Sequence, residues 1–134
     1  MDDLPPGALL VFDRTEDLLA FESSAHATNY LEAIDVDEGE YTAAYTPDGR
    51  VLALSAPEPW KGPVVVTRTD RSDPADLERR VARYWQVHQK GQSPRDPRDT
   101  ARFLIARDNR PREGWLNRVT HLLGRTHAQR APRR

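Results

Sequence analysis

The segment YTAAYTPDGRVLALSA, residues 41–56, constrains the fold more than any other part of this chain. Two runs of strand-forming residues flank the sequence TPDGR. Pro47 suits the first central position of a turn, Asp48 suits the second, and Gly49 follows where the backbone needs a positive φ. The segment therefore predicts a β-hairpin closed by a type I turn with a bulge.

Three further runs are typical of strands. ALLVFD (residues 8–13) and LLAFES (residues 18–23) are separated by RTED, which predicts another hairpin. The alternative is a helix that begins at Thr15, with two acidic residues in its first turn, but the hairpin is preferred. In PVVVTRT (residues 63–69), three consecutive valines indicate a strand with both faces covered, as in the centre of a sheet.

Two segments have the apolar spacing of amphipathic helices. In the first, Ser24 is the expected N-cap, and the helix should end near Asp35. Its apolar face is formed by Ala27, Tyr30, Leu31 and Ile34. In the second, Asp73 can cap the helix, Pro74 fits its first position and Gly91 can close it. Its apolar face is formed by Leu77, Val81, Tyr84, Trp85 and His88.

These elements follow one another in the order ββαβββα. That order predicts an α+β fold, in which helices cover one face of an antiparallel sheet. After Gly91 the chain becomes polar and proline-rich in KGQSPRDPRD, and two more helical patterns follow, the last at about residues 112–123. We therefore expect an acidic α+β domain at residues 1–91 and a basic helical C-terminal extension at residues 92–134, with a frayed tail.

Charge is divided unevenly along the 134 residues. Residues 1–72 hold five basic and 14 acidic side chains, a net charge of −9, whereas residues 73–134 hold 15 basic and seven acidic ones, a net charge of +8. Such an asymmetry indicates charged partners, or two halves that neutralise each other in the folded protein.

The negative charge is concentrated in YLEAIDVDEGEYTAAY, residues 30–45. A calcium loop of the EF-hand type is not expected there. Such a loop needs glycine at its sixth position and glutamate at its twelfth, whereas counting from Asp35 places Gly39 at the fifth position and Thr46 at the twelfth. The expected structure is a solvated loop between a helix and a strand. As a functional site it would be an anionic surface for a basic protein, formed by Asp35, Asp37, Glu38 and Glu40.

Trp60, in the proline-rich sequence EPWKGP, is the other candidate contact residue. Tryptophan is enriched in binding hot spots, although folding back over the core is an equally open alternative. Catalytic and metal-site patterns are not found. There is no cysteine, no nucleophile elbow, no phosphate loop and no histidine pair at helical spacing, so no catalytic residue, metal or cofactor is expected.

Arginines are the main feature of the basic half. On the helix after Asp73, Arg79, Arg80 and Arg83 lie off the apolar stripe and are expected to be solvated. The last two helical patterns could form a helix-turn-helix that contacts nucleic acid. The candidate residues for that alternative are Arg102, Arg107, Arg110, Arg112 and Arg118.

No apolar run is long enough to cross a bilayer, and the acidic N-terminus lacks the features of a secretory signal, so a cytoplasmic location is expected. The segments YLEAIDVDEGEYTAAYTPDGRVLALSA, VVVTRT and DLERRVARYW resemble small actinobacterial immunity-type proteins found beside polymorphic toxins, over about residues 9–85. The resemblance implies a cytoplasmic protein that neutralises a toxin by occlusion, without catalytic residues.

The sequence thus favours a non-enzymatic protein-binding module of immunity or antitoxin type, which uses an acidic face to bind a basic partner, such as a toxin. The alternative is a nucleic-acid-associated regulatory protein that uses the basic C-terminal helices. A small enzyme of unknown reaction is a third hypothesis.

Overall fold

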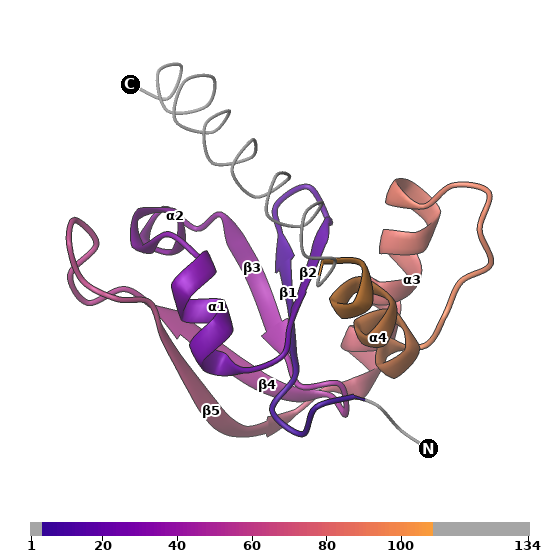
Figure 1. Cartoon of the computed structure of the whole chain (residues 1–134), viewed down its shortest axis with the longest axis horizontal. Helices are drawn as coiled ribbons and strands as arrows, with labels where there is room; N and C mark the ends of the chain where they lie inside the picture. The colour runs from indigo at the N-terminus through magenta and orange to yellow at the C-terminus, as the bar shows by residue number, and fades with distance from the viewer. Residues whose placement is uncertain (1–3, 109–134) are drawn as a thin grey trace.

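The computed structural model describes residues 4–108 as one five-stranded antiparallel sheet and four helices (Figure 1). The first half of the chain supplies β1 (Leu9–Asp13), β2 (Leu18–Phe21), α1 (Ser24–Tyr30), α2 (Ala33–Asp37) and β3 (Tyr41–Tyr45). The second half supplies β4 (Arg50–Ser55), β5 (Val65–Ser72), α3 (Pro74–His88) and α4 (Pro97–Asp108). The predicted α+β class and antiparallel sheet are confirmed.

The strands lie in the order β2-β1-β3-β4-β5, and every neighbouring pair is antiparallel. Both predicted hairpins are present. In the hairpin between β3 and β4, the N–H of Thr46 donates to the carbonyl oxygen of Arg50 at 3.0 Å, and Gly49 has a φ of 98°. A side chain at Gly49 would also collide with Pro74, since a Cβ would lie 2.7 Å from its Cα.

The sheet has a buried centre and a diverging outer ribbon. In β1, the four residues from Leu9 to Phe12 are all buried, because this strand is covered on both faces. Pairing between β3 and β4 is confined to Ala44 with Leu52 and Tyr45 with Val51. Beyond these pairs, β4 and β5 diverge from β3 and carry their connecting loop toward the side where α2 lies (Figure 1).

Two separate core clusters show that helices cover both faces of the sheet, and not one face as expected. On one face, Leu10 and Phe12 of β1 pack with residues of α3 and α4. On the other face, Leu9 and Val11 pack with Ala27 of α1 and with Leu31 just after it. Successive residues of a strand point to opposite faces, so the continuous apolar run of β1 serves both clusters.

The cap of α3 follows the predicted pattern. The Asp73 side chain accepts a hydrogen bond from the N–H of Asp76 at 3.0 Å, and Pro74 is the first helical residue. The next helix, α4, packs against α3 and β2. It buries Thr100, Ala101 and Leu104 completely, and the indole N–H of Trp85 donates to the Thr100 hydroxyl at 2.9 Å. The expected division after residue 91 therefore separates α4 from a core that it helps to form.

Two local expectations are wrong. The first helix begins after Ser23, whose hydroxyl accepts from the N–H of His26, and it stops at Tyr30. Extended backbone at Leu31 and Glu32 then separates α1 from α2, so the apolar spacing does not continue as one helix. The valine strand, β5, pairs only with β4 and lies at the edge of the sheet. The three valines are not covered on both faces, since Val65 is exposed, whereas Val64, which precedes the strand, is buried.

Candidate functional site

A tight turn between β4 and β5 presents Trp60. The backbone N–H groups of Lys61 and Gly62 both donate to the carbonyl oxygen of Glu58, at 3.2 and 2.6 Å. A Cβ on Gly62 would lie 2.7 Å from the Cβ of Glu58 and 2.9 Å from its carbonyl oxygen, so any larger residue would displace the turn. Three prolines in residues 56–63 fix further φ angles. The turn thus holds its shape without help from the indole.

The Trp60 side chain is 83% exposed, the larger exposure of the two large apolar residues at the surface of residues 4–108. Tryptophan is highly buried on average, so an indole held in solvent on a constrained turn is unusual. Such residues are enriched at the centres of protein interfaces. Of the two positions considered from the sequence, the indole is exposed and is not folded over the core.

An open groove of about 410 Å³ lies between this turn and the start of α2, and we call it the Trp60 groove. Its lining on the α2 side is Glu32, Ala33 and Ile34, and on the turn side it is Pro59, Trp60, Lys61 and Gly62. Apolar surface forms much of its lining, and one carboxylate and one ammonium group lie among its residues. The fold therefore brings Trp60 next to the acidic stretch, although Trp60 and Glu32 are 28 positions apart in the sequence.

The four predicted acidic contact residues do not form one exposed face. Asp37 and Glu38 are exposed at the end of α2. Glu40 is mostly covered and accepts a hydrogen bond from Arg14 at 2.8 Å, so an internal cation already neutralises it. Asp35 is only 2% exposed, and its inclusion in the surface was wrong. Extended backbone at Leu31 and Glu32 interrupts the helix before α2 begins. The burial of Asp35 therefore cannot be predicted from the apolar spacing of α1.

The electrostatic effect of this acidic stretch extends to Tyr41 at the start of β3. Burial is the main cause that raises the pKa of the Tyr41 hydroxyl, and the neighbouring Tyr30, Glu40 and Glu32 raise it further. Negative charge that opposes formation of a phenolate equally favours an approaching cation. Glu32 and Glu40 thus add to the effect of burial in keeping the Tyr41 hydroxyl neutral.

The predicted nucleic-acid contacts lie partly within the described chain. Arg102 pairs with Asp99 one turn earlier in α4. Arg107 lies 3.5 Å from Asp108 and 5.8 Å from the ring centroid of Phe103. Carboxylates and an aromatic ring within the domain therefore engage both arginines. The other three, Arg110, Arg112 and Arg118, and the predicted helix at about 112–123, lie outside the described residues.

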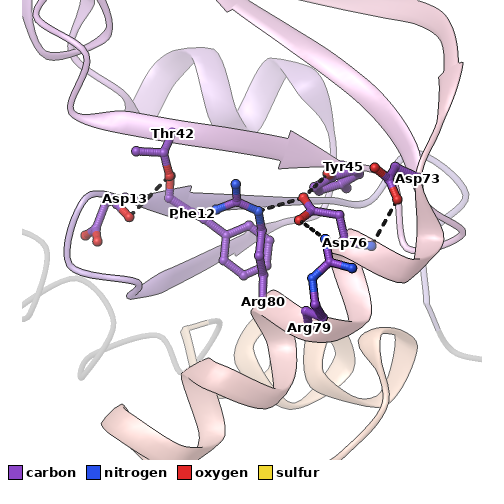
Figure 2. Close-up of polar contacts among 8 residues, drawn as sticks. All are labelled: Phe12, Asp13, Thr42, Tyr45, Asp73, Asp76, Arg79 and Arg80. Carbon is purple, nitrogen blue, oxygen red and sulfur yellow. Dashed lines mark hydrogen bonds and ion pairs between the residues drawn. The ribbon is translucent and has the colours of Figure 1, made fainter.

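A second polar cluster joins the first turns of α3 to the end of β3 (Figure 2), on the sheet face that α3 and α4 cover. The Tyr45 hydroxyl and the Arg80 Nε both donate to the Oδ2 atom of Asp76, and Arg79 donates to Oδ1 at 2.8 Å. The guanidinium of Arg80 also lies 5.8 Å from the ring centroid of Phe12. Sequence reasoning placed Arg80 in solvent and missed this cluster, although Asp76 and Arg80 have the spacing of an ion pair along a helix.

The pKa values of the cluster reflect these bonds. The hydrogen bond from Tyr45, and then that from Arg80, hold the pKa of Asp76 below its ordinary value of 3.8. Burial, followed by the bond to Asp76, raises the pKa of Tyr45 to about 12. Asp76 thus remains ionised and Tyr45 remains neutral at physiological pH. Because both carboxylate oxygens already accept hydrogen bonds, the cluster is suited to joining α3 to β3 and not to proton transfer.

Within residues 4–108, no group of three histidine, cysteine, aspartate or glutamate side chains is arranged to hold a metal ion. In the same part of the chain, no helix combines the length and apolar character needed to cross a membrane. No protein-family model, no curated protein and no solved structure matches the chain. The arrangement of its own residues is therefore the basis for assigning a function.

Proposed function

We propose that this protein is a non-enzymatic binding module of immunity or antitoxin type, and that it uses the Trp60 side of the molecule to bind a basic protein. The observation that supports this proposal is the 83% exposure of Trp60 on a constrained turn beside an acidic stretch. An apolar anchor surrounded by charge is the usual composition of a specific interface. The negative surroundings would accelerate association with a basic partner.

The proposed contact residues differ from those expected from sequence. Trp60 is the anchor, Asp37 and Glu38 supply exposed negative charge, and Glu32 lines the groove. Occlusion of a toxin by this surface would need no catalytic group. A cytoplasmic location is part of the same proposal. The nucleic-acid alternative has less support, because the described arginines, Arg102 and Arg107, lie against carboxylates of the domain.

The test uses the products of genes adjacent to the gene for this protein. Each product is titrated with the full-length chain in a calorimeter at two salt concentrations. For a true partner, we expect Trp60→Ala to weaken binding by about 2 kcal/mol or more, as hot-spot residues do. Replacing Asp37 and Glu38 together with serine should weaken binding less and flatten its salt dependence.

The control replaces Glu78 with serine, because this exposed carboxylate lies on α3, on the opposite face of the sheet. That change should leave binding unaltered. If the partner proves toxic when expressed alone, co-expression with the wild-type chain should restore growth and co-expression with Trp60→Ala should not. A partner that binds both surface variants as tightly as the wild type would refute the proposed surface.

A further inference from the structure

Arginine side chains lie over three aromatic rings on the face covered by α3 and α4. Arg80 lies 5.8 Å from the ring centroid of Phe12, and Arg95 lies 5.5 Å from that of Trp85 and 4.6 Å from that of Phe103. Trp60 differs, since within residues 4–108 no cation and no other aromatic ring lies against its indole. Indole is the aromatic ring that attracts cations most strongly, so Trp60 offers a suitable face for one.

Charge around the Trp60 groove favours the same kind of ligand. Glu32, at the N-cap of α2, lines the groove opposite the turn that carries Trp60. Asp37 and Glu38 are exposed farther along α2, and Lys61 is the one cationic residue that lines the groove within the described chain. The lining itself holds one carboxylate and one ammonium group, and the exposed carboxylates farther along α2 add negative charge beside it. Glu32 and Trp60 belong to opposite sides of the groove, so a group that enters it lies between them.

We infer that the Trp60 groove binds an arginine side chain of the basic partner, with the guanidinium against the indole of Trp60 and within hydrogen-bonding reach of Glu32. This inference rests on the proposed function and specifies what the partner presents. Arginine fits better than lysine, because a planar guanidinium stacks on an aromatic face, is weakly hydrated and donates two parallel hydrogen bonds to a carboxylate. A groove of about 410 Å³ has space for one such side chain.

The inference can be tested without the partner. Three short peptides, each with glycines around one central residue, carry arginine, lysine or the uncharged analogue citrulline. Each is titrated into the full-length protein while the indole N–H signals are followed by NMR. Trp60→Phe identifies the Trp60 signal by its loss. We expect the arginine peptide to shift that signal saturably in the millimolar range, and to bind about fivefold more tightly than the lysine peptide.

Two matched variants test whether Glu32 is the carboxylate that binds the guanidinium. Glu32→Gln should weaken binding of the arginine peptide about threefold or more, since it removes one charge-assisted pair. Glu78→Gln removes the same charge from α3 and should leave the titration unchanged. The signal of Trp85, which is 1% exposed, serves as an internal control and should not move.

An unmoved Trp60 signal at saturating arginine peptide would overturn the inference, as would equal binding of the citrulline peptide. These results are separate from the test of the proposed function. If Trp60→Ala abolishes binding of the protein partner but no peptide binds, the surface is correct and its arginine ligand is wrong. If the arginine peptide binds and no protein partner depends on Trp60, the groove has the inferred chemistry and the proposed function fails.

Discussion

The sheet face beneath α3 and α4 encloses its large side chains, whereas the face beneath α1 and α2 leaves one exposed at its margin. On the first face, Tyr84 and Trp85 are each 1% exposed, and α4 completes the cover. On the second, two short helices cover Leu9, Val11 and Phe21, and the turn beside α2 holds Trp60 in solvent. Two tryptophans of one domain thus have opposite environments.

Polar groups are divided in the same way. Asp76, in the first turn of α3, accepts hydrogen bonds on both carboxylate oxygens from Tyr45, Arg79 and Arg80 (Figure 2). Asp37, at the end of α2, is exposed to solvent. Side chains whose bonding capacity is used within the fold stabilise it, and exposed ones can be replaced at little cost. Polar groups of the α3–α4 face are therefore used within the fold, whereas the α1–α2 side carries the exposed residues for which we propose a role in recognition.

Removing α4 should have the largest effect on stability. A chain that ends at Gly91 lacks Thr100, Ala101 and Leu104, all completely buried, and it exposes the indole of Trp85. We expect this chain to lose cooperative thermal unfolding, because the lost burial is comparable with the whole stability of a small domain, about 5–15 kcal/mol. Calorimetry and near-ultraviolet circular dichroism measure the outcome. A cooperative transition in the truncated chain would support residues 1–91 as an independent domain.

Sequence reasoning succeeded where local chemistry determines structure. Gly49 has the positive φ that the TPDGR turn requires, and Asp73 and Pro74 begin α3 as their cap pattern predicts. These features depend on residues within a few positions of one another. It was less successful where distant segments decide the outcome. The valine run became an edge strand because only β4 lies beside it, and no property of the run itself specifies its neighbours.

The candidate site could likewise be predicted only in part from the sequence. Trp60 was identified from residue type and proline context, but its position beside Glu32 depends on the divergence of β4 and β5 from β3. The burial of Asp35 depends on the break after α1, which the apolar spacing did not reveal. The Tyr45–Asp76 bond joins residues 31 positions apart, so only the Asp76–Arg80 half of that cluster has a signal in the sequence.

Substitution of Trp85 should have the next largest effect. Trp85→Ala removes a buried indole that packs against Tyr84 and Phe103 and donates to Thr100. A loss of about 3–5 kcal/mol in the free energy of unfolding is expected, as for other aromatic residues replaced by alanine in a core. Chemical denaturation with a two-state fit measures it. Trp85→Phe should lose less, because it keeps one aromatic ring in the core and gives up the second ring of the indole and its N–H bond. Equal losses in the two variants would mean that the second ring and the N–H bond, and not the presence of an aromatic ring, make Trp85 important.

The cluster under α3 should make stability depend on pH at both extremes. Because the folded state lowers the pKa of Asp76, its ionised carboxylate stabilises the fold above the unfolded pKa of 3.8, and this contribution is lost as the pH falls through the lowered folded value. Because the folded state raises the pKa of Tyr45 from 10.0 to about 12, stability is lost as the pH rises through that interval.

Tyr45→Phe isolates this contribution. The variant should lose about 1–2 kcal/mol at neutral pH, since a hydrogen bond to a charged group is removed. It should also lose the decline in stability between pH 10 and 12 that the wild type shows, because no phenol remains to ionise at that position. Unfolding midpoints in urea across the pH range measure both effects. An alkaline decline that persists unchanged in the variant would mean that another group, such as Tyr41, causes it.

Substitution of Trp60 should have the smallest effect on stability. Backbone bonds from Lys61 and Gly62 to Glu58 hold the turn, and the exposed indole contributes to neither bond. Trp60→Ala should therefore change the free energy of unfolding by no more than about 0.5 kcal/mol, as is typical of surface positions. Denaturation in urea, carried out beside Trp85→Ala, gives the most direct measure of the difference between the two faces. A loss above about 1 kcal/mol in Trp60→Ala would show that the indole packs within the domain in solution. Near-zero loss, together with loss of partner binding, would separate recognition from stability at a single side chain.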